Sequence, residues 1–251
     1  MPAAVCPLCN GTGYKIVERE EVSGAIRCEC AAAERAAQLE SRAGIPPLYA
    51  RASFVNFLNH NNNQALTYVY QQVRGYVREF ATAKLPGLLL TGDPGTGKTH
   101  LAVAALRAIM ADYQRQGLFF DYQNLLDRIR SGYDATSNSS DKEAYRIAME
   151  VDVLLLDDLG AHRVTDWVMD TVTSIITARC NQRKPLIATT NLIDPGFGDA
   201  TYERKGDGPV NYETTLTERI GERACSRLFE MCRVVKVPAI GDYRMWKQKA
   251  K

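Results

Sequence analysis

Gly92-Asp-Pro-Gly-Thr-Gly-Lys-Thr99 is the stretch of this 251-residue chain that decides its fold. Its spacing, one glycine, four residues and then Gly-Lys-Thr, matches the phosphate-binding loop of nucleotide-binding proteins. An apolar run at residues 88–90 precedes the loop and a helical pattern follows it, as this loop requires. A glycine-rich turn with no ligand is the alternative, and the complete signature in its strand-to-helix context argues against it.

The residue types of this stretch suit a phosphate group. Its glycines adopt backbone angles closed to other residues and let main-chain N–H groups approach an anion. The positive end of the following helix adds to the attraction. We expect Lys98 to contact the β- and γ-phosphates and the Thr99 hydroxyl to ligate Mg²⁺. The expected nucleotide-binding residues are Gly92, Asp93, Pro94, Gly95, Thr96, Gly97, Lys98, Thr99 and His100.

Short apolar runs recur along the chain and alternate with helical patterns. They occupy residues 88–90, 118–120, 151–156, 186–190 and 234–237. Continuous apolar runs of this length are typical of strands covered on both faces. Their alternation with helices predicts an α/β fold in which helices flank a mostly parallel sheet.

Three polar residues follow two of these runs. We expect Asp157 to lie near the Mg²⁺ held by Thr99, and Asp158 to polarise the attacking water. Asn191, after the next run, can reach the γ-phosphate or position that water. A polar turn after a buried strand is the alternative for the carboxylates, and asparagine is common in turns at strand ends.

Arg219, Arg223 and Arg227 recur at every fourth position of residues 217–231. On one continuous helix they share a face. Glutamates 218, 222 and 230 allow a solvated, salt-bridged helix. The competing interpretation is a guanidinium that stabilises phosphoryl-transfer charge in a neighbouring subunit.

Four cysteines at the amino-terminal end form two close pairs. Cys6 and Cys9 are followed, after a Gly-containing turn, by Cys28 and Cys30. This arrangement predicts a zinc ion on four thiolates with a hairpin at residues 14–17 and 25–27, although the second pair is C-x-C where C-x-x-C is commoner. A redox dithiol and unmetallated cysteines are the alternatives. A segment this small has little core, so we expect the metal to stabilise its fold.

Residues 31–43 are rich in helix formers, and the helix is predicted to end before Gly44-Ile-Pro-Pro. The domain boundary is therefore predicted there, with a zinc-binding head and helical linker over 1–44 and the nucleotide-binding domain over 45–251. No apolar run approaches membrane-spanning length and the amino terminus lacks the order of a secretory signal, so we expect a cytoplasmic protein.

The net charge of +2 gives no bulk attraction to nucleic acid. Local contacts remain possible at a loop over residues 131–141 and at a segment over residues 162–184. The second segment carries Arg163, Arg179, Arg183 and Lys184, which either contact phosphates or mark a charged helix end.

The cysteine head, the phosphate loop, Asp157-Asp-Leu-Gly, Thr-Thr-Asn191, Ser226-Arg-Leu and Gly241-Asp-Tyr-Arg244 together resemble bacterial replicative-helicase loaders of the DnaC/DnaI type. These are AAA+ ATPases, and the ATPase subunits of IS21-type transposons share their core. The resemblance covers nearly the whole chain. It implies ATP, Mg²⁺, single-stranded DNA and a hexameric, DnaB-like helicase as partners, with the zinc-bearing head docking on that helicase. It implies Walker A at Lys98 and Thr99, Walker B at Asp157 and Asp158, sensor 1 at Asn191, an arginine finger at Arg227 and sensor 2 at Arg244.

Two features depart from the family pattern. Walker B commonly ends in Asp-Glu, whereas Asp158 is one methylene shorter, and residues 194–216 are longer than a compact link. The sequence predicts a helicase loader that forms an ATP-dependent homo-oligomer and hydrolyses ATP to control its grip on helicase and DNA. An IstB-like ATPase that regulates transposition is the closest alternative. A small-molecule kinase is more distant, because no arginine-bearing lid pattern is present.

Overall fold

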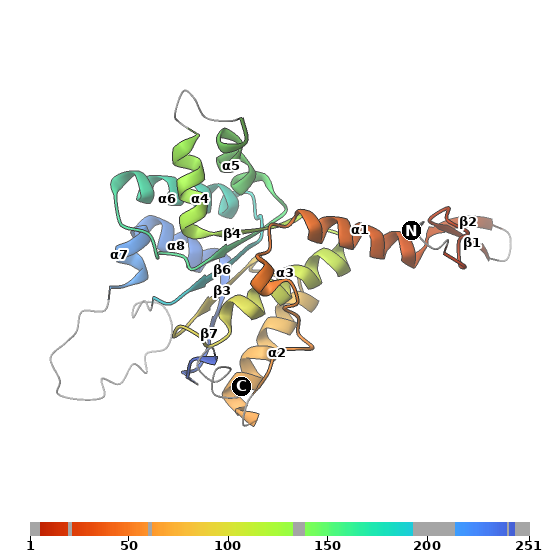
Figure 1. The fold of residues 1–251 in the computed structure, drawn as a ribbon, viewed down its shortest axis with the longest axis horizontal. Helices are drawn as coiled ribbons and strands as arrows, with labels where there is room; N and C mark the ends of the chain where they lie inside the picture. The colour runs from red at the N-terminus through yellow and green to blue at the C-terminus, as the bar shows by residue number, and fades with distance from the viewer. Residues whose placement is uncertain are drawn as a thin grey trace.

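Five parallel strands form the central sheet of the protein (Figure 1). The computed structural model describes residues 6–19, 22–59, 62–132, 139–192, 214–239 and 241–243. The strands follow the spatial order β4-β5-β6-β3-β7, with all neighbours parallel. The apolar runs of the sequence predicted all five. They are β3 (Gly87–Thr91), β4 (Gly117–Asp121), β5 (Val153–Asp157), β6 (Leu186–Thr190) and β7 (Cys232–Lys236).

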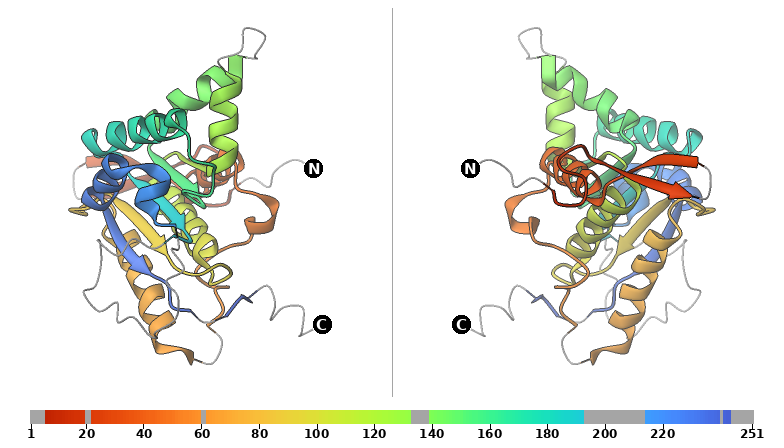
Figure 2. Two further views of the ribbon diagram at one scale, coloured as in Figure 1. Left: turned by 90° about the vertical axis from the view of Figure 1, so that its left-hand side faces the viewer. Right: turned by 90° about the vertical axis from the view of Figure 1, so that its right-hand side faces the viewer.

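Helices cover both faces of this sheet (Figures 1 and 2). One face packs against α2 (Gln64–Arg78) and α3 (Lys98–Tyr113). The other packs against α4 (Tyr122–Ser131), α5 (Ser139–Glu150), α6 (Asp166–Asn181), α7 (Leu216–Ile220) and α8 (Glu222–Met231).

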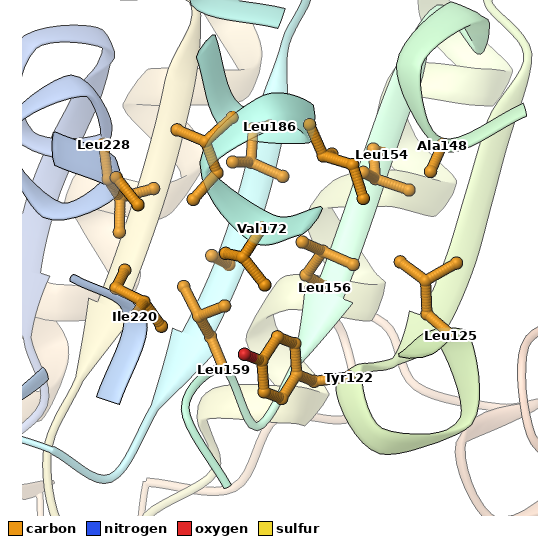
Figure 3. Close-up of a cluster of buried hydrophobic side chains, with 14 of the residues drawn as sticks. Tyr122, Leu125, Ala148, Leu154, Leu156, Leu159, Val172, Leu186, Ile220 and Leu228 are labelled. Carbon is orange, nitrogen blue, oxygen red and sulfur yellow. The ribbon is translucent and has the colours of Figure 1, made fainter. Parts of the chain in front are cut away.

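Alternate strand residues enter the two cores, because successive side chains of a strand point to opposite faces. Val153 and Leu155 belong to the core under α2 and α3. Leu154 and Leu156 belong to the opposite core, where they lie near Val172 of α6 (Figure 3). Both faces of the strands are therefore covered, which explains why they read as continuous apolar runs.

The strand order positions the candidate site. β6 lies between β3 and β5, and β3 leads directly into the phosphate loop. The carboxyl ends of parallel strands share one edge of the sheet, and in open α/β sheets ligands bind at that edge where the strand order reverses. The residues that follow β3, β5 and β6 therefore lie close together.

The cysteine-bearing segment forms a small hairpin that projects from the sheet. It consists of β1 (Tyr14–Arg19) and β2 (Val22–Arg27), paired antiparallel, and is followed by α1 (Glu29–Arg42). In the right-hand view of Figure 2 the hairpin stands in front of the rest of the chain. The hairpin and the helix were both predicted.

The end of α1 is anchored on the nucleotide-binding domain. The Phe119 N–H donates to the Ala43 carbonyl oxygen at 2.7 Å, so the chain after α1 pairs with the edge strand β4. Arg107 of α3 forms an ion pair with Glu40 at 2.8 Å and donates to the Ala52 carbonyl oxygen at 2.7 Å. These contacts hold the junction before the short 3₁₀ turn η1 (Pro47–Tyr49).

Two helix predictions need correction. The single helix expected over residues 217–231 is wrong, because Gly221, at φ 85°, separates α7 from α8. The apolar spacing at residues 65–83 predicts a helix over that range, but α2 already ends at Arg78. The Thr165 hydroxyl caps α6 by accepting the Val168 N–H. Within the described ranges, no helix has the length and apolar character needed to cross a membrane.

Candidate functional site

The phosphate loop connects β3 to α3 in a conformation that only glycines adopt easily. Gly92, Gly95 and Gly97 have φ angles of 139°, 76° and 93°. Lys98 extends back over the loop, and its Nζ donates to the carbonyl oxygens of Gly92 and Asp93, each at 2.7 Å. The buried ammonium is thus held beside the turn of the loop, where a phosphate can take the place of neutral carbonyls as a stronger acceptor.

Side chains from the segment before α2 and from the segment after β7 pack on the loop glycines. A Cβ at Gly97 would lie 2.9 Å from Cε2 of Phe57, and a Cβ at Gly95 would overlap Asp242. The Tyr243 N–H donates to the Gly95 carbonyl oxygen at 3.1 Å. Sequence reasoning missed Phe57, for which the sequence carries no signal. Asp242 stood inside the quoted Gly-Asp-Tyr-Arg motif without a role.

His100 was predicted to bind the nucleotide, and its ring lies on the side of the loop near residues 53–57. Its Nε2 is 2.9 Å from the Ser53 carbonyl oxygen, and its ring centroid is 5.5 Å from that of Phe57. Phe57 also stacks on Tyr70 at 6.1 Å. The segment before α2 therefore forms an aromatic wall next to the phosphate loop.

The two predicted acids meet the phosphate loop. The Thr99 hydroxyl donates to Asp157 Oδ1 at 2.9 Å, across 58 positions of sequence. Burial raises the pKa of the Asp157 carboxyl, and hydrogen bonds from Thr189 and Thr99 act against this rise. A carboxylate oxygen and a hydroxyl oxygen are ligands that Mg²⁺ accepts. These donors fit the magnesium site predicted from the sequence.

Asp158 follows β5 in a left-handed conformation, with φ 59°. Non-glycine residues are uncommon there, and aspartate is among the better tolerated. Asn191, after β6, donates from Nδ2 to Asp158 Oδ1 at 2.7 Å. The structure therefore brings together Lys98, Thr99, Asp157, Asp158 and Asn191.

The arginines are placed elsewhere. Arg227 is exposed on α8 and pairs with Glu230 at 2.5 Å, and none of its described contacts joins it to the phosphate loop. Arg219 lies on α7, on the other side of Gly221, so the three arginines do not share one helix face. Arg244 and most of residues 194–216 lie outside the described residues.

Arg179 cannot contact DNA from its position, so the expected phosphate contact is wrong for this one residue of the segment 162–184. It is fully buried, and burial lowers the pKa of its guanidinium to about 10, so it stays charged at neutral pH. Arg183 donates to the Lys84 carbonyl oxygen at 2.9 Å, and Lys184 to the Glu150 carbonyl oxygen at 2.7 Å. Arg163 remains exposed. The acceptors of Arg179 are the carbonyl oxygens of Ala148, Met149, Val151, Asp152 and Pro185.

The four amino-terminal cysteines form one cluster. Their sulfur atoms lie within 4.8 Å of one another, with Cys9 Sγ 3.4 Å from Cys30 Sγ and Cys6 Sγ 3.9 Å from Cys28 Sγ. Sulfurs at the corners of a tetrahedral Zn²⁺ site, with Zn–S near 2.3 Å, are about 3.8 Å apart. The cluster therefore has the size needed to hold such an ion.

Cys9 and Cys30 of this cluster have pKa values shifted in opposite directions. Burial raises the pKa of Cys9, but the hydrogen bond from Cys30 and the backbone N–H groups of Gly13 and Gly11 outweigh it and lower the pKa to about 6. The same hydrogen bond raises the pKa of Cys30 to about 12. One thiolate is thus already favoured, and thiolates are the form that binds metal.

Sequence comparisons agree with this geometry. The family model described as IstB-like ATP binding protein matches residues 74–202, slightly more than half of the chain. The uncharacterized protein YqaM of Bacillus subtilis (strain 168) is 27% identical over 225 residues, which are 86% of this chain and 64% of that protein. The replicative helicase loader DnaC of Escherichia coli (strain K12) is 26% identical over 195 residues, 76% of this chain and 77% of that protein.

Solved structures match as well. A crystal structure of the DnaC helicase loader has a TM-score of 0.62 at 30% identity and covers 77% of this chain and 100% of that chain. A crystal structure of DnaI has a TM-score of 0.58 at 19% identity, covering 77% and 95%, and supports the fold alone.

The parallel sheet, the phosphate loop after β3 and the acids after β5 define a P-loop protein of the AAA+ type. More narrowly, the chain belongs to the family of IstB-like ATP binding proteins and DnaC-type helicase loaders. The resemblance and the fold class expected from the sequence are therefore confirmed, and the family as a whole consists of AAA+ ATPases.

Proposed function

We propose that this chain is a helicase loader that binds and hydrolyses ATP to control its assembly on a replicative helicase and single-stranded DNA. The observation that carries the proposal is the 2.9 Å hydrogen bond between Thr99 and Asp157, which joins the two halves of a Walker site. The match to the whole length of a DnaC loader chain supports the choice of partner. Residues 1–44 are then the helicase-docking head, residues 45–251 the ATPase domain, and the cytoplasm the place of action.

The proposal gives each residue of the site a role. Lys98 would neutralise phosphate charge, and Thr99, whose hydroxyl donates a hydrogen bond to Asp157, would offer its oxygen as a ligand to Mg²⁺. Asp158 accepts a proton from the attacking water, and Asn191 orients that carboxylate. Bound Mg²⁺ supplies positive charge that stabilises the phosphates. Arg227 and Arg244 complete the site as finger and sensor, in the roles implied by the resemblance.

Single-stranded DNA remains part of the proposal, with a smaller set of candidate contacts. Because the buried Arg179 is excluded as a candidate, the exposed Arg163 is the cation of its segment best suited to contact a phosphate. Nearby, the Arg130 guanidinium lies 4.7 Å from the ring centroid of Trp167, at the start of α6. An aromatic ring next to exposed cations is a combination that binds single strands.

The test of the proposed function is which protein the chain captures, and in which nucleotide state. Calorimetry should detect ATP binding, and the ATP-bound chain should retain a replicative helicase and a labelled single strand more strongly than the ADP-bound chain. Retention of a transposase instead would favour the second candidate, the IstB-like transposition ATPase, which the family model supports. Phosphate transfer to a small acceptor would favour a kinase. Absence of nucleotide binding would rule out all three.

We also propose that the cysteine cluster binds one structural zinc ion. Metal analysis of protein purified without chelator is expected to find one equivalent of zinc per chain, and Cys9→Ser should lose it, because a structural site needs its four ligands. Limited proteolysis of the variant should then cut within residues 6–30, since the hairpin has little core of its own. Cys180→Ser, outside the cluster, is the control and should retain the metal. Zinc-free wild-type protein would refute the proposal.

A further inference from the structure

Thr189 lies at the centre of the candidate active site without a role in the family pattern used above. It is on β6, the strand between β3 and β5, and pairs with Leu90 shortly before the phosphate loop. Only 2% of its surface is exposed. A polar side chain buried to this degree needs hydrogen-bond partners, and its partners reveal what it does.

The Thr189 hydroxyl makes one hydrogen bond to each acidic residue of the site. It accepts the Asp158 backbone N–H at 2.9 Å and donates to Asp157 Oδ1 at 2.6 Å. A backbone N–H can only donate and an ionised carboxylate can only accept, so the hydroxyl proton has one direction available. One buried group thus fixes the backbone of one acid and the side chain of the other.

Both hydrogen bonds that Asp157 receives fall on the same oxygen. Thr99 and Thr189 each donate to Oδ1, and within the described ranges Oδ2 accepts none. The last torsion of an aspartate is otherwise broad, and two donors on one oxygen restrict it. The carboxylate is therefore held with Oδ2 left for a hard cation or for a water that the cation carries.

We propose that Thr189 is a positioning residue, which orients Asp157 toward the Mg²⁺ of a bound nucleotide and holds Asp158 in its left-handed turn. This inference rests on the proposed function, because it concerns the metal that accompanies ATP. Partners of a ligating carboxylate behave in this way in other metal sites, where their loss lowers metal affinity about 10- to 100-fold.

The adjacent residue provides a matched control. Thr190 is 0% exposed, and its hydroxyl also makes two hydrogen bonds, one to the Leu159 carbonyl oxygen at 2.8 Å and one from the Leu192 N–H at 3.1 Å. Neither involves a carboxylate. Thr189→Val and Thr190→Val therefore remove the same group from the same strand, and only the first change reaches the acids.

The experiment is calorimetric binding of a non-hydrolysable ATP analogue to the full chain as Mg²⁺ is raised from zero in EDTA-treated buffer. In Thr189→Val the Mg²⁺ midpoint is expected to rise about tenfold or more, while the affinity without Mg²⁺ stays at the wild-type value. Thr189→Ser keeps the hydroxyl and should restore the midpoint. Thr190→Val should lose stability and keep the wild-type midpoint.

A wild-type midpoint in Thr189→Val, or an equal shift in Thr190→Val, would overturn the inference and leave the proposed function standing. Failure of wild-type protein to bind the analogue at any Mg²⁺ concentration would overturn both. If Thr189→Val does not fold, Thr189→Ala takes its place with the same expected shift, and circular dichroism confirms that each measured variant is folded.

Discussion

Replacing Arg179 by methionine is expected to lower the free energy of unfolding by about 3–5 kcal/mol. Its guanidinium donates to five backbone carbonyl oxygens, at the end of α5, in the link to β5 and just before β6. Methionine has a similar length and no donor, so each of these carbonyls would lose a hydrogen bond, and only that of Pro185 would keep another described one, from the Leu154 N–H. An unsatisfied buried acceptor costs far more than a lost surface contact.

Urea denaturation followed by tryptophan fluorescence is the measurement, with Arg183→Met as the control. Arg183 is exposed and makes one described hydrogen bond, to the Lys84 carbonyl oxygen, so its replacement should change stability by less than about 0.5 kcal/mol. Arg179→Lys should fall between the two, because one ammonium cannot reach all five carbonyls. A stable Arg179→Met protein with weakened single-strand binding would instead revive the DNA interpretation of this residue.

Arg179 also shows where sequence reasoning fails. A cation in the last turn of a helix, close to two other cations, is most often solvated, and the pattern therefore suggested a charged surface. The pattern does not reveal the carbonyls that surround this turn, because they belong to the end of α5, the link to β5 and the residue before β6. Burial of a long polar side chain depends on the tertiary fold, and local composition does not reveal it.

The candidate functional site also contains both residues that the sequence predicts and one that it does not. The phosphate loop, Asp157 and Asp158 were predictable because each follows an apolar strand, and strands of a parallel sheet bring their carboxyl ends to one edge. The role of Thr189 was not predictable, because it depends on how β6 pairs with its two neighbouring strands. That pairing places Thr189 between Leu90 of β3 and the end of β5. In the sequence its hydroxyl cannot be told apart from that of Thr190 in the same strand until its two hydrogen bonds are seen.

The break at Gly221 changes the argument for an arginine finger. Spacing suggested three equivalent arginines, but α7 carries Arg219 and α8 carries Arg223 and Arg227. A glycine within a helical pattern is a weak stop signal, because a helix tolerates it at a cost of about 1 kcal/mol. Because the three arginines do not lie on one helix, the proposal that Arg227 is the arginine finger rests on its Ser-Arg-Leu context and on its exposure.

Arg227→Ala is expected to reduce ATP hydrolysis about 1,000-fold while nucleotide affinity changes by less than about threefold. A guanidinium supplied by a neighbouring subunit stabilises charge that develops during phosphoryl transfer, so its loss affects turnover more than ground-state binding. Arg227 is exposed and pairs with Glu230 on its own helix, and it can exchange that partner for a phosphate at low cost, since surface ion pairs are weak. Arg223→Ala, one turn earlier on α8, is the matched control and should retain activity.

Mixing two inactive variants tests whether Arg227 acts on the nucleotide of a neighbouring subunit or on the nucleotide of its own subunit. Lys98→Ala loses its own phosphate contact and keeps Arg227, whereas Arg227→Ala keeps its own phosphate loop. In a head-to-tail assembly formed at random from equal amounts, about a quarter of the interfaces combine an intact loop with an intact arginine. Hydrolysis should therefore return to about a quarter of the wild-type rate per subunit. A mixture no more active than its parts would show that Arg227 is not shared between subunits, because about a quarter of the interfaces would contain both an intact loop and an intact arginine and would still be inactive.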